Sequence, residues 1–262
     1  MLKLNEKDIQ SNWVKFRELI NTTFVGERRD KLNEMYDFLE ERIMLTPASG
    51  KEHFHNAFPG GYIDHILRVI ELSLQFKELW EKNGVEMDFT KEDLIFSAMH
   101  HDLGKTGDTK GDYYVPNESQ WHREKMGLLY KFNENIHHMT VSDRTFWMLQ
   151  NFGVKFSQVE WIGIRCTDGL YEPENETYLM QADPGRQLKT NIAYILHQAD
   201  FTASRIEYLN WKKNKTLIGD LDSNGESNTV IFKKTNIGRI SNIVTKNHMS
   251  SSQKEMFDDL FK

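Results

Sequence analysis

MHHDLGKTGD, residues 99–108, lies near the middle of the chain and places two histidines and an aspartate side by side. These residues, His100, His101 and Asp102, follow an apolar stretch and precede a glycine and a lysine. One interpretation is a helix end whose polar side chains face solvent. The other is a set of metal ligands, because imidazoles and carboxylates bind divalent cations. The direction of each side chain around the helix distinguishes the two.

The helical period assigns these side chains to different faces. A helix turns about 100° per residue, so residues three and four apart share a stripe. The apolar stripe of this helix then contains Leu94, Ala98, His101 and Asp102. His100 falls nearly opposite. We therefore expect His101 and Asp102 to point toward the core and His100 to point away from it.

Two other predicted helices each carry one such residue at the border of an apolar face. His65 lies in the helix predicted over residues 62–83, and Asp200 lies in the helix predicted over residues 187–212. If each residue is considered alone, His65 is more commonly a histidine packed in the core, and Asp200 is more commonly a helix cap. Together with the His-Asp pair, these buried groups would be costly unless paired or bound to a cation. The set suits one divalent metal, namely Mn, Fe, Co, Ni or Zn, and Mg is also compatible.

The order of these residues resembles the HD-domain metal-dependent phosphohydrolase family. The family signature is a histidine, a later His-Asp doublet and a final aspartate, each on a different helix. The matching positions are His65 in FPGGYIDHILRVIELS, His101 and Asp102 in HHDLGK, and Asp200 in LHQADFTASR. WHREKMG, residues 121–127, is similar to the next block of the family. The resemblance covers about residues 51–210. The sequence as a whole is similar to those of HD proteins encoded by bacteriophages.

The resemblance implies an all-α HD-domain helical bundle and a hydrolase that acts on a nucleotide or another phosphoester. His65, His101, Asp102 and Asp200 would hold the metal, whose bound water would be the nucleophile. Asp102 or Asp200 would also steer this water or accept its proton.

Four further residues are candidates around this metal. Lys105 is expected to neutralise a phosphate oxygen, although a solvated lysine at a helix C-terminus is an equal alternative. His122 would bind phosphate, protonate the leaving oxygen or ligate a second metal, and Arg123 would assist it unless it is a plain surface arginine. Tyr114, with its aromatic neighbours, would stack a base, whereas aromatic residues at this spacing more commonly belong to the core.

A second metal is less well supported by the sequence. Family members with two metals carry a further histidine near a segment like IRCTDGLYE, residues 164–172, where this chain has Thr167. Threonine is a poor replacement for an imidazole. His137 and His138 lie nearby in sequence, but ENIHHMT reads as a solvated loop, and two exposed histidines are the favoured interpretation.

The remaining pattern divides the chain into three parts: N-terminal helices over 1–50, the HD-type domain over 51–212, and a polar linker and tail over 213–262. Helices are expected over 7–22, 28–45, 118–132, 141–152 and 157–168, in addition to those above. Capping boxes are expected at Thr90 with Asp93 and at Ser157 with Glu160. A small hairpin over 229–244 and a short helix over 251–262 are expected in the tail.

The composition restricts the class of protein. The net charge of −6 provides no global basic field for nucleic acid or lipid, although a local groove stays possible. The single cysteine, Cys166, excludes an internal disulfide and a thiolate metal cage. With no signal peptide and no membrane-spanning stretch, we expect a cytoplasmic protein, in the host cytoplasm if viral. The expected partner is a phosphorylated small molecule.

Two alternatives stay open at this point. A 3′–5′ exonuclease on single-stranded nucleic acid would use the basic tail residues, Lys212, Lys213, Lys215, Lys233, Lys234 and Arg239. A non-catalytic HD nucleotide sensor or adaptor would act through SSQKEMFDDLFK, residues 251–262, as a protein-binding segment. Packing of this segment on its own domain is the favoured interpretation of the tail.

Overall fold

The computed structural model describes residues 4–224 of the chain, with side chains through Lys215. The helices are α1 (Glu6–Thr23), α2 (Gly26–Leu45), α3 (Gly61–Lys82), α4 (Lys91–His100), α5 (Gln120–Met126), α6 (Val141–Asn151), α7 (Gln158–Arg165), α8 (Glu176–Leu179) and α9 (Ile192–Asn224). Single 3-10 turns are η1 (Leu103–Thr106), η2 (Gly169–Tyr171) and η3 (Pro173–Asn175). The predicted all-α fold class is confirmed.

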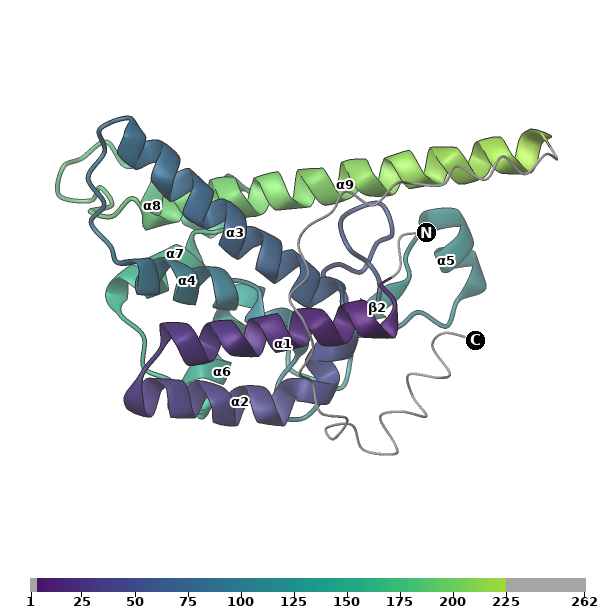
Figure 1. Cartoon of the computed structure of the whole chain (residues 1–262), viewed down its shortest axis with the longest axis horizontal. Coiled ribbons are helices and arrows are strands. Elements are labelled where there is room, and N and C mark those ends of the chain that lie inside the picture. The colour runs from purple at the N-terminus through teal and green to yellow at the C-terminus, as the bar shows by residue number, and fades with distance from the viewer. Residues whose placement is uncertain (1–3, 225–262) are drawn as a thin grey trace, which may run out of the picture.

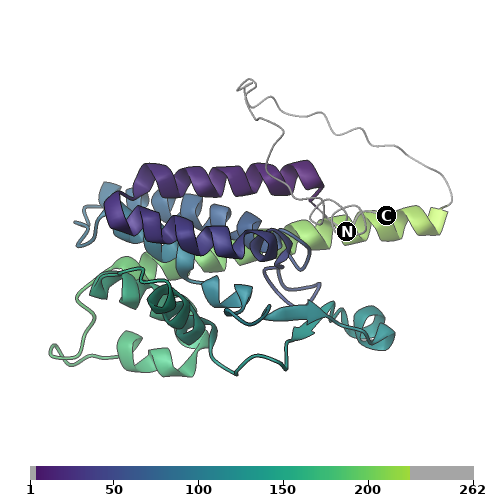
Figure 2. The same cartoon turned by 90° about the horizontal axis from the view of Figure 1, so that it is seen from below.

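The helices form layers around α3 and α9. The antiparallel pair α1–α2 covers one side, and α6, α7 and α8 lie on the other (Figures 1 and 2). Between them, α3 contacts both α4 and α9, and α4 also contacts α7. This arrangement brings residues from distant parts of the sequence to the centre of the bundle.

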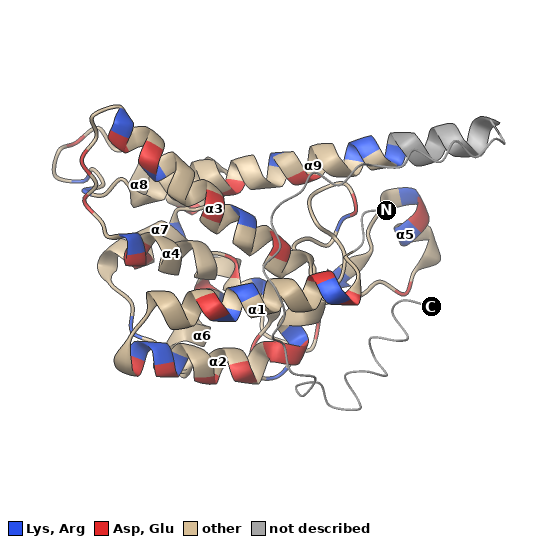
Figure 3. Ribbon diagram, in the orientation of Figure 1, with Lys and Arg blue, Asp and Glu red and all other residues tan. Residues whose placement is uncertain are grey.

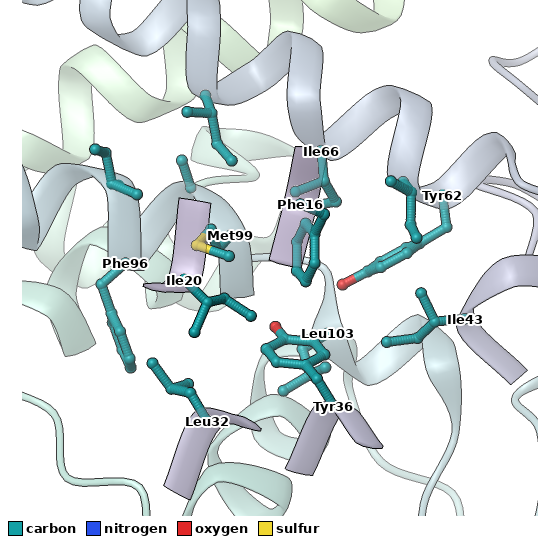
Figure 4. Packing of buried hydrophobic residues seen from close by; sticks show 14 of the residues in the cluster. Phe16, Ile20, Leu32, Tyr36, Ile43, Tyr62, Ile66, Phe96, Met99 and Leu103 are labelled. Atoms are coloured by element: carbon teal, nitrogen blue, oxygen red, sulfur yellow. The ribbon is translucent and has the colours of Figure 1, made fainter. Parts of the chain in front are cut away.

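Buried apolar residues join the first four helices into one core. Figure 4 shows side chains of both α1 and α2 pointing toward those of α3 and α4. The labelled members are Phe16, Ile20, Leu32, Tyr36, Ile43, Tyr62, Ile66, Phe96, Met99 and Leu103. Burial of one large apolar side chain stabilises a fold by roughly 1.5–3 kcal/mol. The N-terminal helices therefore belong to the same core as α3 and α4.

Helix starts follow the predicted capping residues. The Thr90 side chain accepts a hydrogen bond from Asp93 N, and the Asp93 carboxylate accepts one from Thr90 N. Ser157 and Glu160 make the same reciprocal pair at the start of α7. Both predicted capping boxes are confirmed.

The helix predicted over residues 118–132 is confirmed only over α5 (Gln120–Met126) and is wrong beyond it. α5 ends at Gly127, which has the left-handed φ of 61°, a conformation that glycine adopts without steric cost. The chain then forms β2 (Tyr130–Phe132), which pairs antiparallel with β1 (Tyr114–Pro116). Local helical spacing gave no sign of this pairing, because the ladder joins residues far apart in sequence.

α9 is longer than predicted. It passes through the boundary expected after Lys212 and continues to Asn224, so its C-terminal half extends beyond the bundle (Figure 1). The hairpin and short helix predicted for the tail lie outside the described residues.

The outer faces of the bundle carry charges of both signs. Figure 3 shows lysine and arginine interspersed with aspartate and glutamate along α1, α2 and α3. Among the residues that the structure describes, no helix combines the length and apolarity needed to span a membrane.

Candidate metal centre

The end of α4 sets the position of the His-Asp pair. α4 ends at His100, His101 occupies the C-cap, and η1 follows directly. Gly104 allows this turn because a β-carbon there would lie 2.2 Å from the Val141 carbonyl oxygen of α6. Its backbone N–H donates to Thr145 Oγ1 at 2.9 Å. The missing side chain of Gly104 therefore lets η1 pack directly against α6.

Four predicted ligands meet at this point. His65 Nε2 lies 3.1 Å from Asp200 Oδ1 and 3.8 Å from Asp102 Oδ2. His101 Nε2 lies 3.5 Å from Asp102 Oδ2 and 3.7 Å from Asp200 Oδ1. His65, His101 and Asp102 are buried, and Asp200 is partly buried. α3, the α4–η1 junction and α9 thus bring all four side chains together.

The other ring nitrogens have fixed partners. His101 Nδ1 donates to the Ala98 carbonyl at 2.9 Å. His65 Nδ1 donates to the Glu207 carboxylate at 3.1 Å, and Arg68 Nη1 donates to Glu207 Oε1 at 2.5 Å. These contacts hold the rings so that each Nε2 points into the cluster, as in metal sites with outer-shell support.

The cluster fits a divalent cation. The Nε2 atoms of His65 and His101 are buried and make no hydrogen bond of suitable geometry. Each faces carboxylate oxygens, so the cluster needs positive charge, which either protonated imidazoles or a bound cation supplies. Burial lowers the pKa of both rings, but Glu207 and then Asp200 raise that of His65 to about 10, and Asp102 raises that of His101 above its ordinary value. A cation would take the place of these protons. His65, His101 and Asp102 offer donor atoms within 4.8 Å of one another. Two imidazoles and two carboxylates suit a transition metal.

The carboxylates of the cluster are ionised at neutral pH. Burial alone would raise the pKa of Asp102, but Lys105 and then His101 hold it well below its ordinary value. Burial would also raise the pKa of Asp200, yet His65, whose Nε2 lies 3.1 Å away, and then the charge of His101 lower it to about 2. The cluster therefore presents negative charge to a cation.

Lys105 lies against the cluster. Its Nζ is 2.6 Å from Asp102 Oδ2. Burial opposes its charge, but Asp102 raises the pKa of Lys105 above its ordinary value. The lysine is therefore a fixed positive charge beside the candidate metal ligands rather than a solvated side chain.

A pocket of about 320 Å³ opens beside Lys105. Tyr114 of β1 lines it, as does His55, whose ring centroid lies 4.9 Å from that of His65. Burial, and next the charge of His65, lower the pKa of His55 to about 3, so this imidazole is neutral. The sequence analysis missed His55, although residues 48–61 contain two histidines, His53 and His55.

Glu207 was also missed. It lies seven residues after Asp200, two turns along α9, and is buried against His65. This spacing on one helix face is the signal that could have identified it.

Other predicted residues lie elsewhere. His122 and Arg123 belong to α5, at the far end of the hairpin from α4 (Figure 2), and Arg123 Nη1 donates to the Asn117 carbonyl at 2.5 Å. Thr167 Oγ1 donates to the Gly163 carbonyl at 2.7 Å, so its hydroxyl is engaged on its own helix. His137 and His138 are exposed, as expected.

The expectation for His100 was wrong in one respect. Its side chain does lie away from the cluster, but it is fully buried. Nδ1 donates to the Phe96 carbonyl at 2.6 Å, and the ring packs near Tyr36. Burial lowers the pKa of His100 to about 3. The α2 helix covers this side of α4, so both faces of α4 are core faces.

No family model matches the chain, and neither the curated proteins nor the solved structures give a match. The geometry of the cluster therefore carries the functional argument.

Proposed function

We propose that this protein is an HD-type metal-dependent phosphohydrolase. One observation carries the proposal: His65, His101, Asp102 and Asp200 converge from α3, the α4–η1 junction and α9, and the buried Nε2 atoms of both histidines point at the two carboxylates. Lys105 adds a positive charge at the same place. This combination matches the needs of phosphoester hydrolysis, which are a metal-bound water and a cation for the phosphate.

Each side chain has a task in this proposal. A bound metal would supply a water whose pKa falls to about 7, so that hydroxide is available at neutral pH. His65 and His101 hold their rings in the ligating orientation through Glu207 and the Ala98 carbonyl. Lys105 neutralises charge on a phosphate oxygen. Asp200 is the more exposed carboxylate, at 20% against 8% for Asp102, and orients the attacking water.

The proposal requires one metal. Thr167 occupies the position where a further histidine would be needed, and its hydroxyl is already bonded within α7 and its C-terminal turn. His122 has no assigned role, and its predicted function stays a prediction.

The test measures hydrolysis of bis(4-nitrophenyl) phosphate, a nucleotide panel and single-stranded RNA and DNA with Mn, Fe, Co, Ni, Zn or Mg added. Asp102→Ala should lose metal-dependent turnover and bound metal. Asp37→Ala is the matched control, because Asp37 is an exposed aspartate paired with Arg17 on the outer helices.

The outcomes separate the candidate functions. Turnover that needs a metal and is lost only in Asp102→Ala supports the hydrolase. Cleavage confined to single strands would support the exonuclease. Metal binding without turnover of any substrate would overturn catalysis and favour a sensor.

A further inference from the structure

Arg68 connects the buried carboxylate behind His65 to the outside of the bundle. It lies three residues after His65 on α3, and residues at this spacing share one face of a helix. Its Nη1 donates to Glu207 Oε1 at 2.5 Å and to Asp64 Oδ2 at 3.0 Å. One guanidinium nitrogen therefore bridges two carboxylates, and one of these, Glu207, accepts from Nδ1 of His65.

Glu207 depends on this guanidinium for a charged partner. Its side chain is only 1% exposed. Among the residues that the structure describes, its polar contacts are with His65 and Arg68. A buried carboxylate is costly without such partners. Without Arg68, Glu207 would turn toward solvent or take up a proton, and either change would weaken its contact with His65.

Asp64 holds Arg68 from the other side. Its carboxylate accepts a hydrogen bond from Asn56 Nδ2 at 2.9 Å and one from Asn12 Nδ2 at 3.4 Å. Asn12 belongs to α1, and Asn56 belongs to the loop before α3. The orientation of Arg68 is therefore fixed by two segments that contribute no side chain to the candidate ligand set.

A pocket of about 160 Å³ reaches this bridge from outside. Asn56, Asp64, Arg68, Glu207 and Trp211 are among the residues that line it. Removal of the Arg68 side chain beyond its β-carbon would enlarge this pocket. A free guanidinium ion then has room to lie between the two carboxylates.

We propose that Arg68 is a positioning residue, which keeps Glu207 against His65 and through that contact strengthens metal binding. The inference rests on the metal site of the proposed function but not on hydrolysis. The sign of the effect separates positioning from simple charge. A fixed guanidinium repels a nearby cation, so loss of its charge alone would tighten metal binding, whereas loss of positioning weakens it.

Competition between the full chain and a chromogenic chelator for Co²⁺ measures the effect. Arg68→Ala should weaken Co²⁺ binding about fivefold or more, because partners outside the ligand set commonly contribute ~10–100-fold. Millimolar guanidinium should restore most of this loss. Arg29→Ala, at an exposed arginine of α2 beside Asp30, is the control and should match the wild type with and without guanidinium.

Two results of this measurement would overturn the proposal. Unchanged or tighter Co²⁺ binding in Arg68→Ala would show that Arg68 contributes no positioning. A loss that guanidinium does not restore would assign the effect to a changed fold rather than to the missing bridge.

A double substitution tests the route through Glu207. If Arg68 acts through this carboxylate, Arg68→Ala added to Glu207→Gln should weaken Co²⁺ binding no further than Glu207→Gln alone. Additive losses would show that Arg68 acts by another route and would overturn the proposal.

Nuclear magnetic resonance of the metal-free protein keeps this inference separate from the proposed function. The Nδ1 proton of His65, held by Glu207, should give a slowly exchanging signal in the wild type. The signal should vanish in Arg68→Ala and return with guanidinium. This pattern in a wild type that binds no Co²⁺ supports the positioning role and defeats the metal site. An unchanged signal in Arg68→Ala, with metal-dependent turnover in the wild type, defeats only the positioning role.

Discussion

His65 uses its two ring nitrogens for different tasks. Nε2 faces the carboxylates of the cluster, and Nδ1 donates to Glu207, which Arg68 also holds. Such outer-shell carboxylates fix the ring and raise the basicity of the ligand. Asp200 could be predicted from the order of residues in the sequence. The seven-residue spacing from Asp200 places Glu207 on the same face of α9, but its contact with His65 depends on the distance between α3 and α9, which no local pattern reports.

Glu207→Gln should lower metal affinity about tenfold or more. The substitution keeps the shape but removes the charge that stabilises the His65 ring in its ligating form. Competition with a chromogenic chelator measures the affinity. Glu71→Gln, at an exposed glutamate on α3, is the control. Equal affinities in the two variants would show that Glu207 does not support the ligand.

Cys166 should make stability depend on alkaline pH. Burial raises the pKa of its thiol from 9.0 to about 11 in the folded chain. The folded state therefore holds the proton more tightly, so this stability is present below pH 9 and is lost as the pH rises toward 11. Urea unfolding across this range should show a shallower decline for Cys166→Ala than for wild type. Parallel declines would contradict the shifted pKa.

At the scale of elements, helical periodicity predicted most of the fold. Capping boxes at Thr90 and Ser157 gave two helix starts correctly, because these signals lie within four residues of the chain. The β1–β2 hairpin was missed, since Tyr114 pairs with Phe132 across an intervening helix. Aromatic residues, such as those between 113 and 132, are as compatible with a strand as with a helix. The pairing of β1 with β2 in the folded chain decides for the strand.

Ser157→Ala should destabilise the protein by about 1 kcal/mol, because Glu160 N loses its acceptor at the start of α7. Chemical denaturation gives the change in free energy of unfolding. Ser204→Ala serves for comparison, since the Ser204 hydroxyl bonds back to Phe201 O within α9. We expect that control to stay within about 0.5 kcal/mol of wild type. A Ser157→Ala protein as stable as the control would show that the cap contributes nothing.

At the scale of the molecule, the ligand set links α3, the end of α4 and α9. A cation that binds only the folded arrangement stabilises the whole bundle by mass action. At a hundredfold excess over Kd the gain is about 2.7 kcal/mol, which corresponds to roughly 5–10 °C in Tm. Thermal denaturation with metal and with EDTA measures the difference. The shift should persist in Asp37→Ala and vanish in Asp102→Ala, and a shift that survives in Asp102→Ala would place the metal elsewhere.

α9 connects the candidate metal centre to the outside of the bundle. The same helix carries Asp200 and Glu207 inside the fold and continues to Asn224 beyond it. A slip of one residue along this helix moves every side chain 1.5 Å along the axis and about 100° around it. Both carboxylates would leave His65 in the same step. We therefore expect a displacement of the outer half of α9 to reach both carboxylates, because one continuous helix carries them.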